Sequence, residues 1–217
     1  MVNFDTRRTM MVDTQVRPSD VTKFPIIDAM LRVPRELYVP DHQREAAYLG
    51  DNLHLSADRV MLEPRTLAKM LDALEIAPGH VALDLGCGMG YATAVLASLA
   101  DFVVGVEEDP DLASEAEALL AEQGVHNAAV IAGHVAEGAA KSGPYDIIVT
   151  QGAVETVPQV IVDQLREGGR IACIFAEKAL GVVRLGHKID GDVTWRFAFN
   201  AGAPVLKGFE RAPNFAL

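Results

Sequence analysis

A glycine-rich turn between an apolar run and a helical pattern constrains the fold of this chain more than any other feature. The segment Val81–Tyr91 reads VALDLGCGMGY, so three alternating glycines, Gly86, Gly88 and Gly90, follow a short apolar run. Glycine reaches positive φ without strain, and its missing side chain lets a ligand lie against the backbone. A helix that starts there adds free N–H groups and a positive dipole end. The turn therefore predicts a ligand site where a buried strand ends.

The pattern of strand, turn and helix recurs through the second half of the sequence. We expect strands at 80–85, 102–106, 128–131, 145–150 and 170–175, separated by helices at 91–99, 112–123 and 157–165. Such alternation predicts an α/β fold with a mostly parallel central sheet and helices on both faces. Residues 181–199 alternate apolar and polar around Asp190-Gly191, which predicts an appended C-terminal antiparallel hairpin. Trp195 and Phe197 are expected as core residues of its edge strand.

The first 75 residues predict N-terminal helices and a polar loop. Apolar positions at helical spacing indicate a helix from about Val21 to Leu37, interrupted at Pro34, and another at Glu63–Leu74. The polar segment 41–58 lies between them. The sequence does not decide whether this segment closes over the cofactor as a lid. We expect one domain over 1–217, with 1–75 as its helical, substrate-side part and 76–217 as a nucleotide-binding sheet.

Composition narrows the partners and the compartment. The net charge of −11 makes a diffuse acidic surface that repels phosphate backbones, so nucleic acid is not an expected partner. The two cysteines, Cys87 and Cys173, lack metal-ligand spacing and form no disulfide framework. No apolar run is long enough to span a bilayer. These features predict a cytoplasmic protein without metal or membrane attachment, and they leave its oligomeric state open.

The glycine spacing distinguishes between two cofactor classes. Dinucleotide sites prefer G-x-G-x-x-G, but Tyr91 stands where the last glycine would be. The G-x-G-x-G spacing, introduced by Asp84, resembles the turn that binds S-adenosylmethionine (SAM), with Asp84 near the methionine moiety and the glycines beside the ribose. About 20 residues further on, an apolar run ends in Glu107, where an acid can accept both ribose hydroxyls. Together these features predict SAM as the cofactor.

Longer stretches resemble the protein-L-isoaspartate O-methyltransferase family, over nearly the whole chain to about Phe175. They are MVDTQVR at 11–17, IDAMLRVPRE at 27–36, YVP at 38–40, PYDIIVT at 144–150 and QLREGGR at 164–170. The resemblance implies a Rossmann-like SAM-dependent methyltransferase fold. It also implies methylation of isoaspartyl (or D-aspartyl) carboxyl groups in the repair of damaged proteins. The residues expected around SAM are Asp84, Gly86, Cys87, Gly88, Gly90, Tyr91, Glu107, Glu108, Gly133, His134 and Val135.

Two departures from the family pattern concern the substrate side and the adenine side. The family has a Thr-Ile-Ser segment before a helix-starting proline, but anchoring on Pro64 gives Val60-Met61-Leu62, which carries no hydroxyl. His54-Leu55-Ser56 supplies a polar group in an alternative alignment with extra residues before Pro64. The family also typically has Gly-Asp where this chain has Gly133-His134. A neutral His134 can still accept a hydrogen bond through one ring nitrogen.

The expected chemistry requires little from the protein's side chains. An acceptor carboxylate with a pKa near 4 is ionised at neutral pH, so alignment and exclusion of water suffice and no general base is needed. We therefore nominate no catalytic residue. Arg59 or Arg65 is a candidate partner for a substrate carboxylate, and Gln151 should line the transfer site at a strand end. The substrate-side candidates are His54, Ser56, Arg59, Leu62 and Gln151.

Three functions remain compatible with the sequence. The first is an isoaspartyl carboxyl methyltransferase acting on proteins or peptides. The second is a SAM enzyme of the same fold with a different, small-molecule acceptor, which the apolar segment Val60-Met61-Leu62 favours. The third is a SAM-binding module without transferase activity, with which the acidic surface is compatible.

Overall fold

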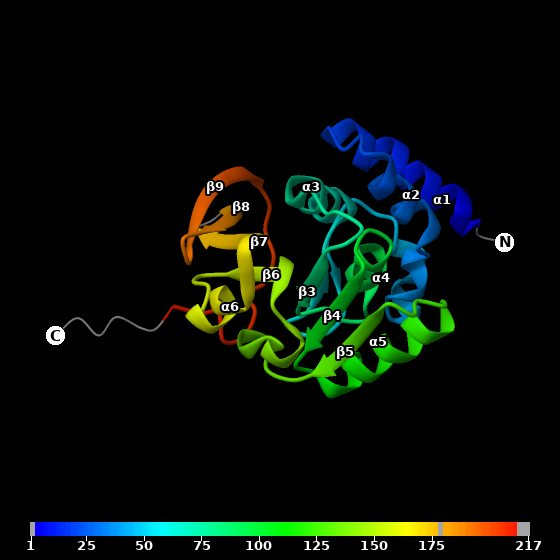
Figure 1. Cartoon of the computed structure of the whole chain (residues 1–217). Coiled ribbons are helices and arrows are strands. Elements are labelled where there is room, and N and C mark those ends of the chain that lie inside the picture. Colours follow the sequence, from blue (N-terminus) through cyan, green and yellow to red (C-terminus); the bar gives the residue numbers. More distant parts are fainter. Residues whose placement is uncertain (1–2, 178–179, 212–217) are drawn as a thin grey trace.

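A seven-stranded sheet forms the centre of the computed structural model, which describes residues 3–177 and 180–211 (Figure 1). The strand order is β5-β4-β3-β6-β7-β8-β9. The strands are β3 (Val81–Leu85), β4 (Phe102–Glu107), β5 (Ala128–Ala132), β6 (Tyr145–Val154), β7 (Leu165–Glu177), β8 (Leu180–Ile189) and β9 (Asp192–Asn200). The first five strands in this order, from β5 to β7, pair in parallel with their neighbours. Strand β8 pairs antiparallel with both β7 and β9. The predicted parallel sheet and its C-terminal hairpin are therefore confirmed.

Six α-helices surround this sheet in the described part of the chain. They are α1 (Phe4–Met11), α2 (Phe24–Arg32), α3 (Pro64–Leu74), α4 (Tyr91–Ala97), α5 (Pro110–Glu122) and α6 (Gln159–Gln164). Short π and 3-10 turns connect them at η1 (Val12–Val16), η2 (Arg17–Ser19), η3 (Arg35–Leu37), η4 (Asp41–Ala46), η5 (Val135–Glu137) and η6 (Ala140–Ser142). A small separate hairpin consists of β1 (Leu53–His54) and β2 (Val60–Met61). No described helix is both long and apolar enough to cross a membrane.

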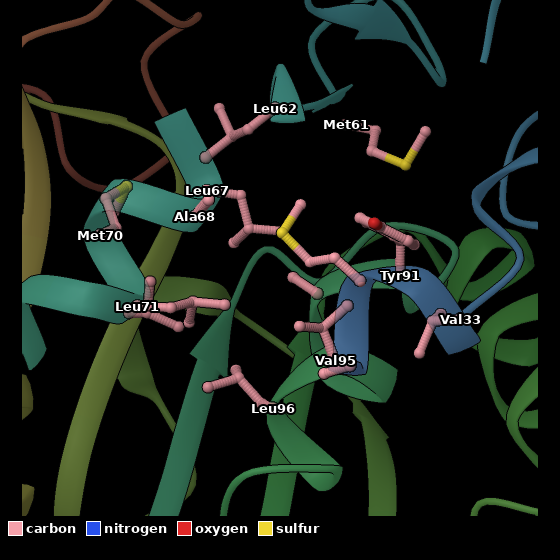
Figure 2. Packing of buried hydrophobic residues seen from close by; sticks show 14 of the residues in the cluster. Val33, Met61, Leu62, Leu67, Ala68, Met70, Leu71, Tyr91, Val95 and Leu96 are labelled. Carbon is pink, nitrogen blue, oxygen red and sulfur yellow. The ribbon is translucent and has the colours of Figure 1, made fainter. Parts of the chain in front are cut away.

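Alternate side chains of the parallel strands enter two hydrophobic clusters, one on each face of the sheet. Ala82 and Val103 belong to the larger cluster, whereas their neighbours Leu83 and Val104 belong to the smaller one. The larger cluster joins the N-terminal helices to α3 and α4; Figure 2 shows residues of both helices, including Leu71 and Leu96, within it. The smaller cluster contains Ile161 of α6 together with Leu206 and Phe209 of the C-terminal segment. The N-terminal helices therefore pack against the same core as the glycine turn's helix.

Prolines set the boundaries of the N-terminal helices. The helix expected over 21–37 is shorter in the structure, because α2 ends at Arg32 and Val33 is extended with φ −74° and ψ 117°. The residue before a proline avoids the helical region, so Pro34 forces this end. Helix α3 begins at Pro64, one residue after the expected Glu63, and ends at the expected Leu74, where Glu75 caps it in the left-handed conformation.

The outermost strand corrects one expectation about the core. Trp195 is half-buried and packs edge-on against Phe175, with ring centroids 5.0 Å apart. Phe197 is 63% exposed, so its expected core position was wrong. Phe199 pairs with Val183 while Phe197 pairs with Arg184, so a bulge at Ala198 shifts the alternation. The bulge turns Phe199, instead of Phe197, into the larger cluster.

Candidate active site

The carboxyl ends of β3, β4 and β6 meet where the order of the sheet reverses. Strand β3 has β4 on one side and β6 on the other, which makes this the topological switch point where open α/β sheets bind ligands. The glycine turn follows β3 here, and Gly86, Gly88 and Gly90 have φ of +76°, +56° and +91°. These values are in the region that disfavours other residues, so the backbone itself requires the glycines that the sequence shows.

A fully buried carboxylate joins three elements below the turn. Asp84 accepts a hydrogen bond from Thr93 Oγ1 of α4 at 2.7 Å and another from Gln151 Nε2 of β6 at 2.7 Å. Burial raises the pKa of Asp84 to about 6, although both hydrogen bonds lower it. Asp84, which was predicted to lie near SAM, and Gln151, which was predicted on the substrate side, thus lie in direct contact. The carboxylate orients Gln151 at the strand end.

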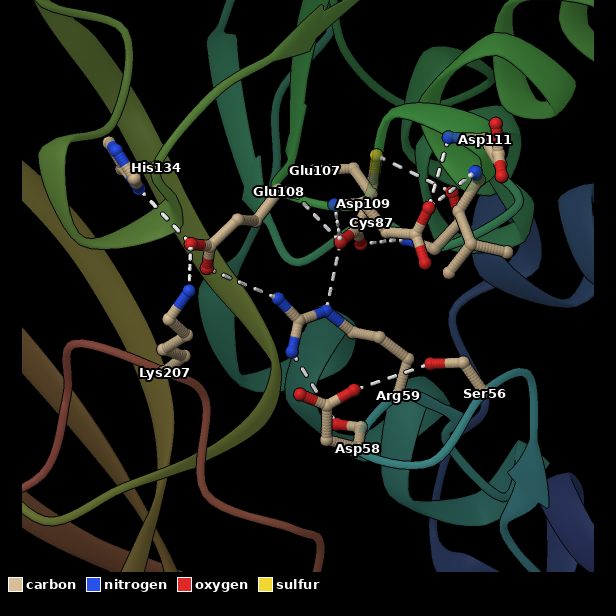
Figure 3. A network of polar contacts seen from close by, with 12 residues as sticks. Ser56, Asp58, Arg59, Cys87, Glu107, Glu108, Asp109, Asp111, His134 and Lys207 are labelled. Carbon is tan, nitrogen blue, oxygen red and sulfur yellow. Dashed lines mark hydrogen bonds and ion pairs between the residues drawn. The ribbon is translucent and has the colours of Figure 1, made fainter.

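The second predicted acid, Glu107, is held by four donors. One oxygen accepts from Arg59 Nε at 2.9 Å and from the backbone N–H groups of Glu108 and Asp109 at 2.8 and 3.1 Å, while the other accepts from Gly88 N at 2.9 Å (Figure 3). Glu107 is completely buried. The acid at the end of β4 is therefore hydrogen-bonded directly to the glycine turn, which brings the two expected ribose-binding features together.

Arg59 occupies a different place from the one expected. Its side chain is 4% exposed and lies inside the protein, with Nη2 3.9 Å from Glu108. In this conformation the Arg59 guanidinium forms a buried ion pair with Glu107, so it is not available to a substrate carboxylate. The other candidate, Arg65, is exposed and lies 3.8 Å from Glu63. Sequence reasoning had no signal for the Arg59–Glu107 pair, because its partners are 48 positions apart.

Side chains from two covering segments fill the space over the glycines. A Cβ on Gly88 would collide with Leu55 in the β1–β2 hairpin, and Cβ atoms on Gly86 and Gly152 would come within 2.9 and 2.6 Å of Leu206. Leu206 lies in a C-terminal segment that hydrogen-bonds to Ala153 at the end of β6. The positive-φ glycines and Glu107 fit a nucleoside in kind, and Leu55 and Leu206 cover this part of the turn. The sequence contained no signal for Leu206.

A cluster of charges forms the rim on the β4 side. Glu108 accepts from Lys207 Nζ at 2.7 Å and contacts His134 Nδ1 at 3.1 Å (Figure 3). The hydrogen bond from Lys207 lowers the pKa of Glu108. Gly133 donates its N–H to the Glu107 carbonyl at 2.9 Å. The structure thus places Glu108, Gly133 and His134 together, whereas the Val135 side chain packs into the smaller cluster.

The other substrate-side candidates are divided between the surface and the interior. His54 is exposed, and Ser56 Oγ donates to Asp58 within its own turn at 3.4 Å. Leu62 is buried and, like Gln151, lines a cavity of ≈ 10 Å³ beside the glycine turn. Cys87 lines the same cavity, and burial raises the pKa of its thiol, which keeps it protonated. Sequence reasoning therefore identified part of this cavity but missed Tyr38.

The sheet order, the positive-φ glycine turn and the strand-end acid define a Rossmann-like methyltransferase fold. Two solved structures share this fold. One is a protein-L-isoaspartate O-methyltransferase (TM-score 0.82, 23% identity, 93% of this chain and 66% of that chain), about a third of which has no counterpart here. The other is a putative enzyme of that name from Plasmodium falciparum in complex with S-adenosyl-L-homocysteine (TM-score 0.79, 20% identity, 95% and 99%).

Sequence similarity identifies the family. Residues 7–196 match the model of the protein-L-isoaspartate(D-aspartate) O-methyltransferase family, and the chain belongs to it. A protein-L-isoaspartate O-methyltransferase from Methanoculleus marisnigri is 37% identical over 164 residues, covering 76% of this chain and 74% of the relative. One from Koribacter versatilis is 34% identical over 187 residues, covering 85% and 84%. The family resemblance expected from the sequence motifs is confirmed.

Proposed function

We propose that this chain is a SAM-dependent carboxyl methyltransferase that acts on isoaspartyl residues of damaged proteins. The observation that carries the proposal is the bond between Glu107 and Gly88, which joins a strand-end acid to a positive-φ glycine turn at the switch point. Membership of the family and the names of its relatives support the reaction and the protein substrate.

Each group of site residues has a proposed part in holding the cofactor. The glycine turn and Glu107 would hold the ribose, the rim of Glu108 and His134 the adenine, and Asp84 with Gln151 the methionine side. When bound, SAM supplies an electrophilic methyl group on a sulfonium. The protein's own contribution is alignment and exclusion of water by the buried wall of Val60, Met61 and Leu62, because the acceptor carboxylate is already ionised at neutral pH.

Binding requires the covering segments to move. Leu55 and Leu206 fill the space over the glycines, and Arg59 uses the carboxylate assigned to the ribose. The sequence left open whether the segment 41–58 is a lid, and we propose that the β1–β2 hairpin, which includes the end of that segment, acts as one. The ordered turn of residues 55–59, closed by hydrogen bonds from Leu55 and Ser56 to the Arg59 carbonyl, can move as a unit.

The test of function compares two peptides that differ only at one aspartate. The purified chain is incubated with labelled SAM and an isoaspartyl peptide, beside its normal aspartyl twin, and base-labile methyl ester is counted. We expect ester on the isoaspartyl peptide alone. Absence of ester from a protein that binds SAM in calorimetry would overturn the proposed acceptor.

A different acceptor is the second candidate function. The wall of Val60, Met61 and Leu62 carries no side-chain hydroxyl and is buried, which favours a smaller, apolar acceptor. The same labelled-SAM assay on a panel of small apolar carboxylic acids distinguishes the two. Turnover on that panel without turnover on the isoaspartyl peptide would select this alternative, whereas binding without any turnover would indicate a SAM-binding module.

A further inference from the structure

Three buried polar groups without partners lie together on the acceptor side of the glycine turn. Arg35 Nη1, Tyr38 Oη and Tyr91 Oη have no hydrogen-bond partner among the residues that the structure describes. The Arg35 guanidinium lies over the Tyr91 ring, 4.8 Å from its centroid, and the Tyr38 and Tyr91 rings meet edge-on at 5.9 Å. Because buried polar groups are nearly always paired, three orphaned donors in one cluster require an explanation.

Arg35 makes this cluster positively charged. Its Nε and Nη2 donate to the carbonyls of Ala47 and Leu62, each at 2.7 Å, so both recorded partners are neutral. The side chain is completely buried. Burial lowers the pKa of Arg35, although its interactions with Tyr91 and with the Glu63 carboxylate raise it, which reflects the cost of burying a guanidinium. An anion bound beside it would offset that cost.

The cluster is next to the site of methyl transfer. A cavity of ≈ 10 Å³, enough for one water molecule, is lined by Tyr38 and Tyr91 together with Cys87 of the glycine turn and Gln151. Leu55 and Met61 of the β1–β2 hairpin also line it; Figure 2 shows Met61 on the same side of the cluster as Tyr91. Movement of that hairpin would therefore widen the cavity and expose the Gly88 cradle together.

We propose that Tyr38 and Tyr91, with the Arg35 charge behind them, bind the carboxylate of the methyl acceptor once the β1–β2 hairpin has moved. A carboxylate accepts several hydrogen bonds at once and forms its strongest ones with charged donors. The two phenol groups supply the hydroxyls that Val60-Met61-Leu62 lacks. This inference rests on the proposed function, since it places the acceptor of that reaction.

The test removes the hydroxyls and leaves the rings. Tyr38→Phe, Tyr91→Phe and the double variant delete groups that have no partner, so the melting temperature should stay level or rise. In the double variant we expect KM for an isoaspartyl peptide to rise by about tenfold while kcat changes little. In Tyr38→Phe, which changes none of the residues expected around SAM, calorimetry should give an unchanged Kd for S-adenosylhomocysteine. Arg35 is left intact because it binds two backbone carbonyls.

Tyr145→Phe is the matched control. Tyr145 is also a buried tyrosine, but its hydroxyl donates to the Ala139 carbonyl at 2.7 Å in the other cluster. Its loss should lower the melting temperature and leave KM unchanged. An unchanged KM in the Tyr38 and Tyr91 variants, as expected if the hydroxyls only hold a water molecule, would overturn the inference.

A binding experiment separates this inference from the proposed function. The isoaspartyl peptide is titrated into protein saturated with S-adenosylhomocysteine, which requires no turnover. Peptide binding that weakens in the double variant supports the carboxylate site, even where the wild type forms no ester and the proposed function fails. Wild-type ester formation with equal peptide affinity in wild type and double variant would overturn the inference alone. A wild type that binds no peptide would overturn it as well.

Discussion

Asp84, the carboxylate below the glycine turn, lowers the stability of the folded protein at neutral pH. It is fully buried, and Thr93 and Gln151 each hold one of its oxygens. Its pKa of about 6 is above the ordinary value for an aspartate, so the folded state binds a proton that the unfolded state releases between about pH 4 and 6. The contribution of this group to the free energy of unfolding is therefore fully present below about pH 4 and is lost as the pH rises through about 6.

Asp84→Asn tests this sign directly. At pH 7.5 the variant should be more stable than the wild type by about 1–3 kcal/mol, because it removes an ionised buried group. The difference should vanish near pH 4, where both side chains are neutral. Thermal and urea unfolding of both proteins across this range measures it, with all other titrating groups shared. A wild type that is the more stable protein at pH 7.5 would contradict the assigned pKa direction.

At the scale of elements, the β1–β2 hairpin connects the fold to the function. It supplies Leu55, which covers Gly88, and its second strand is preceded by Arg59, which binds Glu107. A ligand that bonds to Oε1 of Glu107 must first displace the Arg59 guanidinium, because that oxygen already accepts three hydrogen bonds. The apparent Kd for the ligand is then the intrinsic Kd divided by the fraction of molecules in which the hairpin is open.

Arg59→Met should therefore tighten the binding of S-adenosylhomocysteine, by roughly tenfold in Kd, or about 1.4 kcal/mol. The same change should lower the melting temperature, because it breaks a buried ion pair. Calorimetric titration gives the first quantity and thermal unfolding the second. Arg65→Met is the control, since Arg65 is exposed and its Nε is 3.8 Å from the carboxylate of its acidic neighbour Glu63. Weaker ligand binding by Arg59→Met would show that Arg59 holds the ligand instead of competing with it.

Elements governed by local patterns were predicted well from the sequence. The glycine turn, β3 and β4 lie within a residue of their expected bounds, because apolar runs and positive-φ glycines are encoded locally. Strand β7 begins at Leu165 and continues to Glu177, beyond the expected 170–175, because β6 pairs with Leu165 and β8 pairs as far as Glu177. The Arg59–Glu107 pair, the Leu206 cover and the Tyr38–Tyr91 cluster depend on tertiary contacts, for which a single sequence carries no signal.

Across the whole molecule, the site is assembled from segments distant in the chain. The switch point of the sheet supplies Asp84 and Glu107, the β1–β2 hairpin covers one side, and the segment containing Leu206 covers another. The larger hydrophobic cluster connects the N-terminal helices to α4, next to the glycine turn. Cofactor binding therefore requires the two covering segments to move while the sheet stays intact.

Titration of S-adenosylhomocysteine into the full chain, in a calorimeter near pH 7.5, shows whether the covered glycine turn and Glu107 bind the SAM nucleoside. We predict one site per chain with a Kd of about 1–100 μM, and a melting temperature that rises with ligand concentration. No heat of binding and no rise in melting temperature at millimolar ligand would contradict it.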